Sequence, residues 1–157
     1  MKEVYEVLKK LNIKYEEMEH KAVYISEEAM FITKEMKGTG VKNLFLKSKQ
    51  KFYLVLIPES KRANIKQIEK QINEKSLSFA NEKYLKEILN LTPGSVTPFG
   101  IINDKENKVT IVIEETLINK KVLFHPNTNK KTIKIDYNDL IKFIKNENHE
   151  YLILKEN

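Results

Sequence analysis

The chain has 157 residues, carries a formal net charge of +6 and contains no cysteine. The absence of cysteine excludes thiolate nucleophiles, disulfide bridges and cysteine-ligated metal centres, and it is typical of proteins from a reducing compartment. The longest strongly apolar run, residues 52–57, is far too short to cross a bilayer. We therefore expect a soluble cytoplasmic protein with no membrane partner, folded as a single domain over residues 1–157.

The positive charge is concentrated in one segment of the chain. Residues 42–70 hold eight basic and two acidic side chains, an excess equal to the net charge of the whole protein. Arg62 is the only arginine, so this segment offers lysine ammonium groups and almost none of the bidentate forks that read guanine. The pattern favours contact with a nucleic-acid backbone over sequence-specific DNA binding. A solvated lysine-rich surface without a partner stays open as the alternative.

Hydrophobic spacing predicts the elements of the N-terminal half. Helices are expected over residues 4–11, 26–36 and 65–72, and Ser26 is expected to cap the second of them. Strands are expected over residues 14–20, 42–47 and 52–57, the last two joined as a hairpin. Asn81 is expected to cap a helix that continues to Leu89, and residues 77–79 are either a strand or a connector.

The C-terminal half begins with a constrained loop, because residues 92–100 hold two of the four glycines and two of the four prolines. Strands are expected over residues 108–113, 121–125, 131–135 and 151–154. Asp136 is expected to cap a helix that contains Leu140 and Ile144. Helices and strands do not alternate strictly, so we predict an α+β fold with a mixed, mostly antiparallel sheet and surrounding helices.

Several kinds of site are not supported by the spacing of the polar residues. Gly38 and Gly40 lack the third glycine of a dinucleotide fingerprint and the spacing of a phosphate-binding P-loop. Gly94 and Ser95 do not form the Gly-x-Ser-x-Gly elbow of a serine hydrolase. The three histidines are far apart and show no metal-ligand spacing, so we expect no metal and no cofactor.

Four motifs together resemble the YbaK/prolyl-tRNA-synthetase-associated domain family, and within it the free-standing ProX or PrdX type of prolyl-tRNA editing protein. The motifs are Ser-Glu-Glu-Ala at 26–29, Gly-Val-Lys-Asn-Leu-Phe-Leu at 40–46, Pro-Gly-Ser-Val-Thr-Pro-Phe-Gly at 93–100 and Phe-His-Pro-Asn-Thr-Asn at 124–129. Their order and spacing cover nearly the whole chain. The sequence departs from many family members at Asn127, where a leucine is expected after His-Pro.

The resemblance implies hydrolysis of the ester that joins a wrong amino acid to the 3′ adenosine of a tRNA. Within the ProX branch this implies removal of alanine from proline tRNA, with prolyl-tRNA synthetase as a further partner. Two alternatives stay open: a deacylase for cysteinyl-tRNA or another small aminoacyl-tRNA, and a non-catalytic tRNA-binding module of the same fold. An aminoacyl ester is already activated, so positioned water and a stabilised oxyanion suffice without a serine, cysteine or metal.

The resemblance also implies the residues of the site. The expected catalytic residues are Lys42, Gly94, Ser95 and Pro98. The expected substrate-binding residues are Asn43, Val96, Thr97, Phe99, His125 and Pro126. Lys42 is expected to bind and orient the substrate rather than to act as a base, and His125 is expected to border the pocket for the amino-acid side chain.

Contacts with tRNA are expected from the basic segment. The candidates are Lys47, Lys49, Lys51, Lys61 and Arg62, followed by Lys66 and Lys70 further along the same segment.

Overall fold

The structure is a computed structural model that describes residues 2–156. Its centre is one sheet of eight strands with the order β1-β7-β6-β2-β3-β5-β8, and β4 pairs with β2 off this path. The strands are β1 (Glu16–Glu19), β2 (Thr39–Lys47), β3 (Phe52–Pro58), β4 (Ser78–Phe79), β5 (Val109–Glu114), β6 (Lys121–Phe124), β7 (Lys131–Asp136) and β8 (Tyr151–Leu154).

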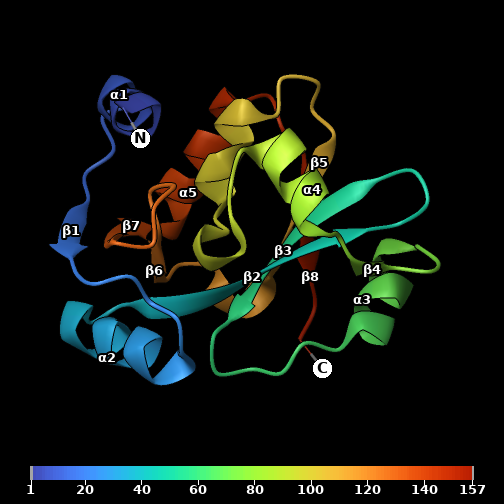
Figure 1. Cartoon of the computed structure of the whole chain (residues 1–157), viewed down its shortest axis with the longest axis horizontal. Coiled ribbons are helices and arrows are strands. Elements are labelled where there is room, and N and C mark those ends of the chain that lie inside the picture. The colour runs from blue at the N-terminus through green and yellow to red at the C-terminus, as the bar shows by residue number, and fades with distance from the viewer. Residues whose placement is uncertain (1, 157) are drawn as a thin grey trace.

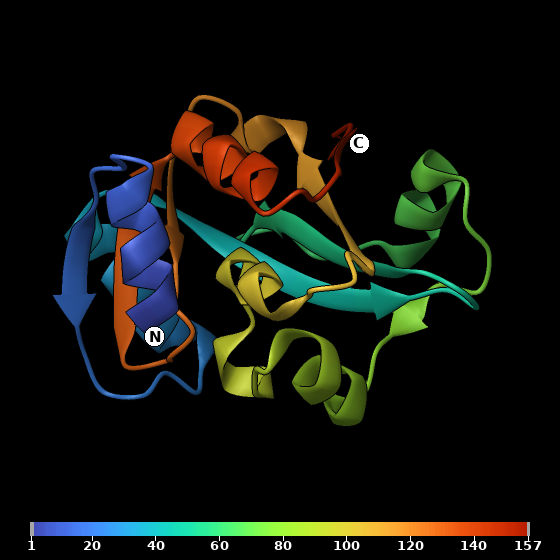
Figure 2. The same cartoon turned by 90° about the horizontal axis from the view of Figure 1, so that it is seen from above.

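Helices and short helical turns join these strands. The α-helices are α1 (Lys2–Lys10), α2 (Ser26–Met36), α3 (Ile65–Ile72), α4 (Glu82–Tyr84) and α5 (Tyr137–Asn146). The other helical turns are η1 (Leu85–Leu89), η2 (Pro93–Ser95), η3 (Pro98–Asn103) and η4 (Glu115–Leu117). Figures 1 and 2 show α1 and α2 at the end of the sheet that carries β1, and α3 at the opposite end beside β4. No helix in the described range has the length and apolar character that a membrane crossing needs.

Strand pairing is mixed, which confirms the predicted α+β fold. The pairs β1–β7, β6–β7, β2–β3 and β2–β4 are antiparallel. The pairs β2–β6, β3–β5 and β5–β8 are parallel. The hairpin predicted from residues 42–47 and 52–57 is present, with Leu44 opposite Val55.

The start of β2 differs from the prediction, which placed it at Lys42. Thr39 and Gly40 already belong to the strand because they pair in parallel with Val122 and Leu123 of β6. This pairing joins segments about eighty residues apart in sequence. The local sequence around Gly40 does not predict it. The strand therefore brings Gly40 and Val41 into the sheet beside the end of β6.

The predicted helix caps have different outcomes. Asn81 caps α4 as predicted, because its side chain accepts a hydrogen bond from the amide of Tyr84 at 3.1 Å. Ser26 was predicted wrongly as a cap: the N-cap of α2 is Ile25, whose amide donates to the Glu28 carboxylate at 3.2 Å. Asp136 occupies the N-cap of α5, but its side chain makes no capping hydrogen bond.

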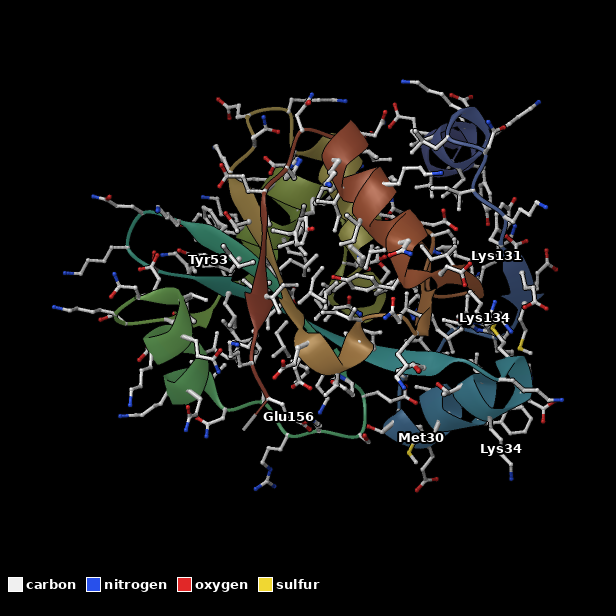
Figure 3. The ribbon with its side chains drawn as sticks, turned by 180° about the vertical axis from the view of Figure 1, so that it is seen from behind. Met30, Lys34, Tyr53, Lys131, Lys134 and Glu156 are labelled. Carbon is white, nitrogen blue, oxygen red and sulfur yellow. The ribbon has the colours of Figure 1, made fainter. Side chains whose placement is uncertain are left out.

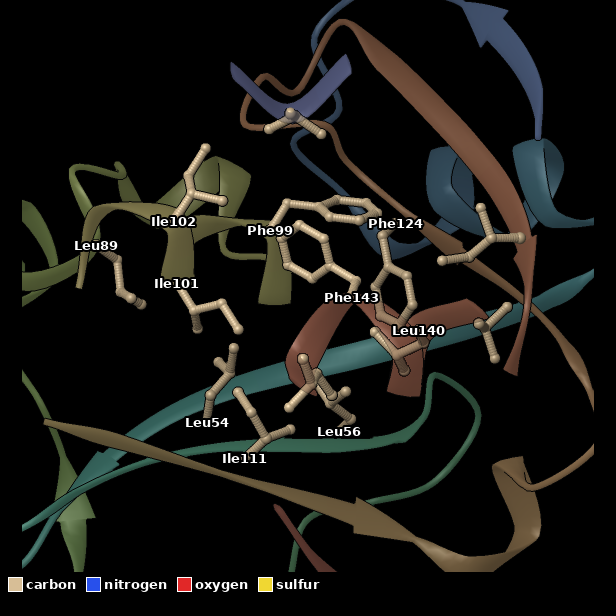
Figure 4. Packing of buried hydrophobic residues seen from close by; sticks show 14 of the residues in the cluster. Leu54, Leu56, Leu89, Phe99, Ile101, Ile102, Ile111, Phe124, Leu140 and Phe143 are labelled. Atoms are coloured by element: carbon tan, nitrogen blue, oxygen red, sulfur yellow. The ribbon is translucent and has the colours of Figure 1, made fainter. Parts of the chain in front are cut away.

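Hydrophobic clusters fill both faces of the sheet. The larger cluster contains the rings of Phe99, Phe124 and Phe143, and Phe99 meets the other two edge-on at centroid distances of 6.0 and 5.0 Å (Figure 4). The smaller cluster lies on the opposite face, where Ile68 of α3 packs against Leu44 and Ile57. Successive residues of β2 and β3 therefore alternate between the two clusters, as the pleat requires.

A buried ion pair ties the end of η3 to the start of β8. The imidazole Nε2 of His149 lies 2.8 Å from the carboxylate of Asp104, and both side chains are almost fully buried. The Nδ1 of His149 donates to the Glu147 carbonyl at 2.8 Å, so both ring nitrogens face acceptors. Burial alone would lower the pKa of His149, but these hydrogen bonds raise it above its ordinary value. Burial alone would raise the pKa of Asp104, but bonds from His149 and two backbone amides hold it below its ordinary value.

This pair predicts how stability depends on pH. Its contribution is complete between the ordinary pKa values of aspartate and histidine, about 3.9 and 6.5, and is lost as pH rises through the raised pKa of His149. We expect His149→Leu to lower the free energy of unfolding by about 3 kcal/mol near pH 6, because Asp104 is left as an unpaired buried charge. The loss should shrink as pH rises. Urea unfolding of both proteins across a pH series measures it, and a loss that does not change with pH would contradict the pairing.

Candidate functional site

A small pocket lies between α2 and the sheet, where β2 meets β6. Its volume is about 80 Å³, and Ala29 and Ile32 of α2 form part of its wall. The polar residues that line it are Thr33, Asn43, Glu59, His125 and Thr132. A cavity of about 150 Å³ admits benzene, so the size of this pocket matches a small aliphatic group better than an aromatic ring.

α2 covers this pocket with one face and presents the other to solvent. Ile32 is buried on the inner side. Met30 and Lys34 point away from the sheet, as Figure 3 shows, and 59% of Met30 is exposed. The helix therefore acts as the outer wall of the pocket.

His125 projects into the pocket from the segment that follows β6. Its Nδ1 lies 2.8 Å from the backbone carbonyl of Lys131, which can only accept, so Nδ1 carries the hydrogen and Nε2 keeps its lone pair. Burial lowers the pKa of His125, and the neighbouring His20 ring, at a centroid distance of 6.0 Å, lowers it further. His125 is therefore a neutral hydrogen-bond acceptor at neutral pH.

Lys42 and Asn43 are neighbours on β2 and lie on opposite faces of the sheet. Asn43 pairs with Leu56 on the face that carries the pocket. Lys42 pairs with Ile57 on the α3 face, and its Nζ donates to the backbone carbonyl of Lys61 at 2.5 Å. The structure thus brings Asn43 and His125 together in one pocket and places the Lys42 side chain behind the sheet.

The loop around Gly94 lies beside the segment that follows His125. Gly94 is exposed, and a β-carbon at this position would lie 3.3 Å from the Asn129 side chain. The amide of Ser95 donates to the Thr92 carbonyl at 3.0 Å, and that of Gly100 donates to the Thr97 carbonyl at 3.1 Å. Within residues 2–156 the amides of Val96 and Thr97 donate to no acceptor; Thr97 is fully buried and Val96 is partly exposed, so the Val96 amide is the one placed to meet an oxyanion.

The remaining expected site residues lie around this loop with different surroundings. Ser95 is buried, and in the described part of the chain its hydroxyl forms hydrogen bonds with Thr92 alone. Phe99 is fully buried in the core and packs on Phe124, the residue before His125. Pro98 and Pro126 are buried as well. Phe99 can therefore influence the pocket only through packing, whereas the loop is exposed at Gly94 and partly exposed at Val96.

The tRNA-contact candidates fall into two groups. Lys49 and Lys51 are exposed in the β2–β3 turn, and Lys47 of the same hairpin lies over the Tyr84 ring at 5.0 Å. Lys61 instead pairs with the buried carboxylate of Glu114 at 2.8 Å and with Glu156. Its ammonium group is thus occupied within the protein, while Arg62, Lys66 and Lys70 are exposed.

Sequence reasoning did not single out Glu59, which lies in the pocket. Its amide donates to the Gly40 carbonyl at 3.0 Å, and its carboxylate occupies the space that a β-carbon on Gly40 would fill. The one available signal was its position directly after the strand-ending Pro58, at the open end of the hairpin, where the partner strand carries Gly40. Thr132, whose hydroxyl bonds to His20 Nε2 at 2.8 Å, also lines the pocket and was not predicted.

Comparisons with known proteins show the family to which the chain is related. The family model of the aminoacyl-tRNA editing domain matches residues 20–143. Prolyl-tRNA editing protein ProX of Acetoanaerobium sticklandii is 38% identical over 141 residues, covering 88% of this chain and 86% of that protein. Prolyl-tRNA synthetase associated domain-containing protein 1 of Danio rerio is 33% identical, covering 98% of this chain and 85% of that protein.

A solved structure supports the fold independently. The crystal structure of hypothetical protein APE2540 superposes with a TM-score of 0.76 at 17% identity and covers 96% of each chain. Together with the motifs and the two relatives, this confirms the resemblance drawn from the sequence. The chain belongs to the family of aminoacyl-tRNA editing domains.

Proposed function

We propose that this aminoacyl-tRNA deacylase hydrolyses alanyl-tRNA whose tRNA is specific for proline. The observation that carries the proposal is the pocket of about 80 Å³, whose size suits the methyl group of alanine better than a bulky side chain. The similarity to a relative named prolyl-tRNA editing protein ProX supports proline tRNA as the carrier. The pocket then works as the second sieve of translation, which hydrolyses products small enough to enter.

Hydrolysis of the ester requires two contributions from the protein. The unpaired amide of Val96, in the partly exposed part of the loop, stabilises the negative charge that develops on the ester carbonyl when water attacks. The pocket positions the aminoacyl group so that this carbonyl reaches the loop. The resemblance drawn from the sequence implies that a ribose hydroxyl of the substrate helps to position the water.

Lys42 serves binding and orientation in this proposal. Its ammonium group holds the Lys61 carbonyl, so it fixes the segment from Pro58 to Arg62 against β2. The same segment carries Glu59 into the pocket on the other face.

Lys42→Ala should lower kcat/KM for alanyl-tRNA at least about tenfold, because the segment that carries Glu59 into the pocket loses its anchor and the substrate is then held less accurately. The measurement is the loss of labelled alanine from proline tRNA under single-turnover conditions. Lys105→Ala, at an exposed site in the loop after η3, is the matched control and should retain the wild-type rate. Equal rates for wild type and Lys42→Ala would contradict the role given to Lys42.

The substrate is tested with alanyl, cysteinyl and prolyl esters on the same proline tRNA. We expect the alanyl ester to be hydrolysed fastest and the prolyl ester at least about tenfold more slowly. A faster cysteinyl ester would assign the chain to the cysteine branch. Binding without loss of any ester would assign it to the non-catalytic class.

Binding of tRNA should depend steeply on salt. Changing Lys47, Lys49 and Lys51 together to Gln should reduce the slope of log affinity against log salt by about 2 to 3, which corresponds to three lost phosphate contacts. The control changes Lys105, Lys120 and Lys145, which are exposed outside the basic segment, and should leave the slope unchanged. An equal slope for both triple variants would show that the hairpin lysines do not contact tRNA and are only a solvated surface.

A further inference from the structure

The polar side chains of the pocket are arranged as hydrogen-bond acceptors. His125 donates through Nδ1 to the Lys131 carbonyl, which leaves the Nε2 lone pair. His20 Nδ1 faces the Lys21 carbonyl and so carries a hydrogen; its Nε2 therefore accepts the hydrogen of the Thr132 hydroxyl. The hydroxyl of Thr33 donates to the Ala29 carbonyl at 3.1 Å. Both threonine hydrogens are thus already used.

Two further acceptors in the pocket have no donor. The Oδ1 atom of Asn43 is buried and accepts no hydrogen bond in the described part of the chain. The Glu59 carboxylate makes no ion pair and accepts no hydrogen bond from any residue between 2 and 156, although the chain is rich in lysine. A buried acceptor such as the Asn43 oxygen is costly unless a ligand supplies a donor, and the partly exposed Glu59 carboxylate in the same pocket is available to bind a cationic group.

Gly40 makes room for this carboxylate. A β-carbon at position 40 would overlap the carboxyl group of Glu59, and the amide of Glu59 is held by the Gly40 carbonyl at 3.0 Å. The backbone of Gly40 does not adopt a positive φ, so space rather than conformation requires glycine here. The carboxylate is therefore held in a defined place at the pocket wall.

We propose that Glu59 recognises the positively charged α-ammonium group of the aminoacyl ester and is a specificity-determining residue of the site. This inference rests on the proposed function and extends it to the chemical group of the substrate that the pocket recognises. A primary ammonium group offers three N–H donors and no acceptor, which matches a wall of acceptors with one negative charge.

The same arrangement explains how proline is distinguished by more than volume. In its protonated form, the primary α-amine of an alanyl ester carries three N–H bonds. The protonated secondary ring amine of a prolyl ester carries two. A site that is built to satisfy several acceptors rejects a ligand that leaves one of them unpaired. Glu59 and Asn43 can thus distinguish an alanyl from a prolyl ester more strongly than pocket size alone can.

The test compares alanyl-tRNA with lactyl-tRNA, in which a neutral hydroxyl replaces the ammonium group at nearly the same size. Each rate is divided by the uncatalysed hydrolysis rate of the same ester, so that intrinsic reactivity cancels. Wild type should then prefer the alanyl ester at least about tenfold. Glu59→Gln should lose most of this preference through a slower alanyl reaction, with the lactyl rate nearly unchanged.

Two further variants make the comparison specific. Gly40→Ala keeps the carboxylate but displaces it from the pocket wall, and it should reduce the alanyl preference in the same direction. Glu106→Gln, whose side chain is 76% exposed, removes a surface charge and should behave as wild type. Thermal unfolding of each variant reports whether the fold is retained.

The possible results separate this inference from the proposed function. If wild type hydrolyses alanyl-tRNA but Glu59→Gln keeps the full alanyl preference, the recognition role is wrong while the proposed function stands. If Glu59→Gln slows both esters equally, Glu59 acts on the reaction and not on the ammonium group, which also overturns the inference. If wild type hydrolyses neither ester, both the proposed function and this inference are wrong.

Discussion

The contact between the Gly40 backbone and Glu59 is the constraint on which the site depends. Glu59 donates its amide to the Gly40 carbonyl and places its carboxylate where any other residue at position 40 would put a side chain. Gly40 in turn is held in the sheet by its pairing with Leu123 of β6. A single position without a side chain therefore aligns β2 and β6 and fixes the charged wall of the pocket.

The segment from Pro58 to Arg62 connects the two faces of the sheet. On one face it supplies Glu59 to the pocket, and on the other its Lys61 carbonyl accepts the hydrogen bond of Lys42. The Lys61 side chain is anchored by the buried Glu114 carboxylate. This arrangement gives Lys42 a way to influence a pocket that its own side chain does not line, because loss of its hydrogen bond frees the segment that carries Glu59.

Local patterns predicted most elements because amphipathic spacing and turn residues act over a few positions. The β2–β3 hairpin and the cap by Asn81 are of this kind. The parallel pairing of Gly40 with Leu123, and the approach of Glu59 to Gly40, depend on contacts that form only when the sheet assembles. Strand alternation could have shown that Lys42 and Asn43 face opposite ways, but the motif resemblance grouped them as one site.

The most direct test of the account is a crystal structure of the protein with 3′-alanylamido-3′-deoxyadenosine, an analogue that cannot be hydrolysed because an amide replaces the ester. The account predicts that the alanyl methyl group occupies the pocket beneath α2, with its ammonium group within hydrogen-bond distance of Glu59 and its carbonyl directed at the amide of Val96. An analogue bound on the opposite face, beside Lys42 and α3, with the pocket empty, would contradict it.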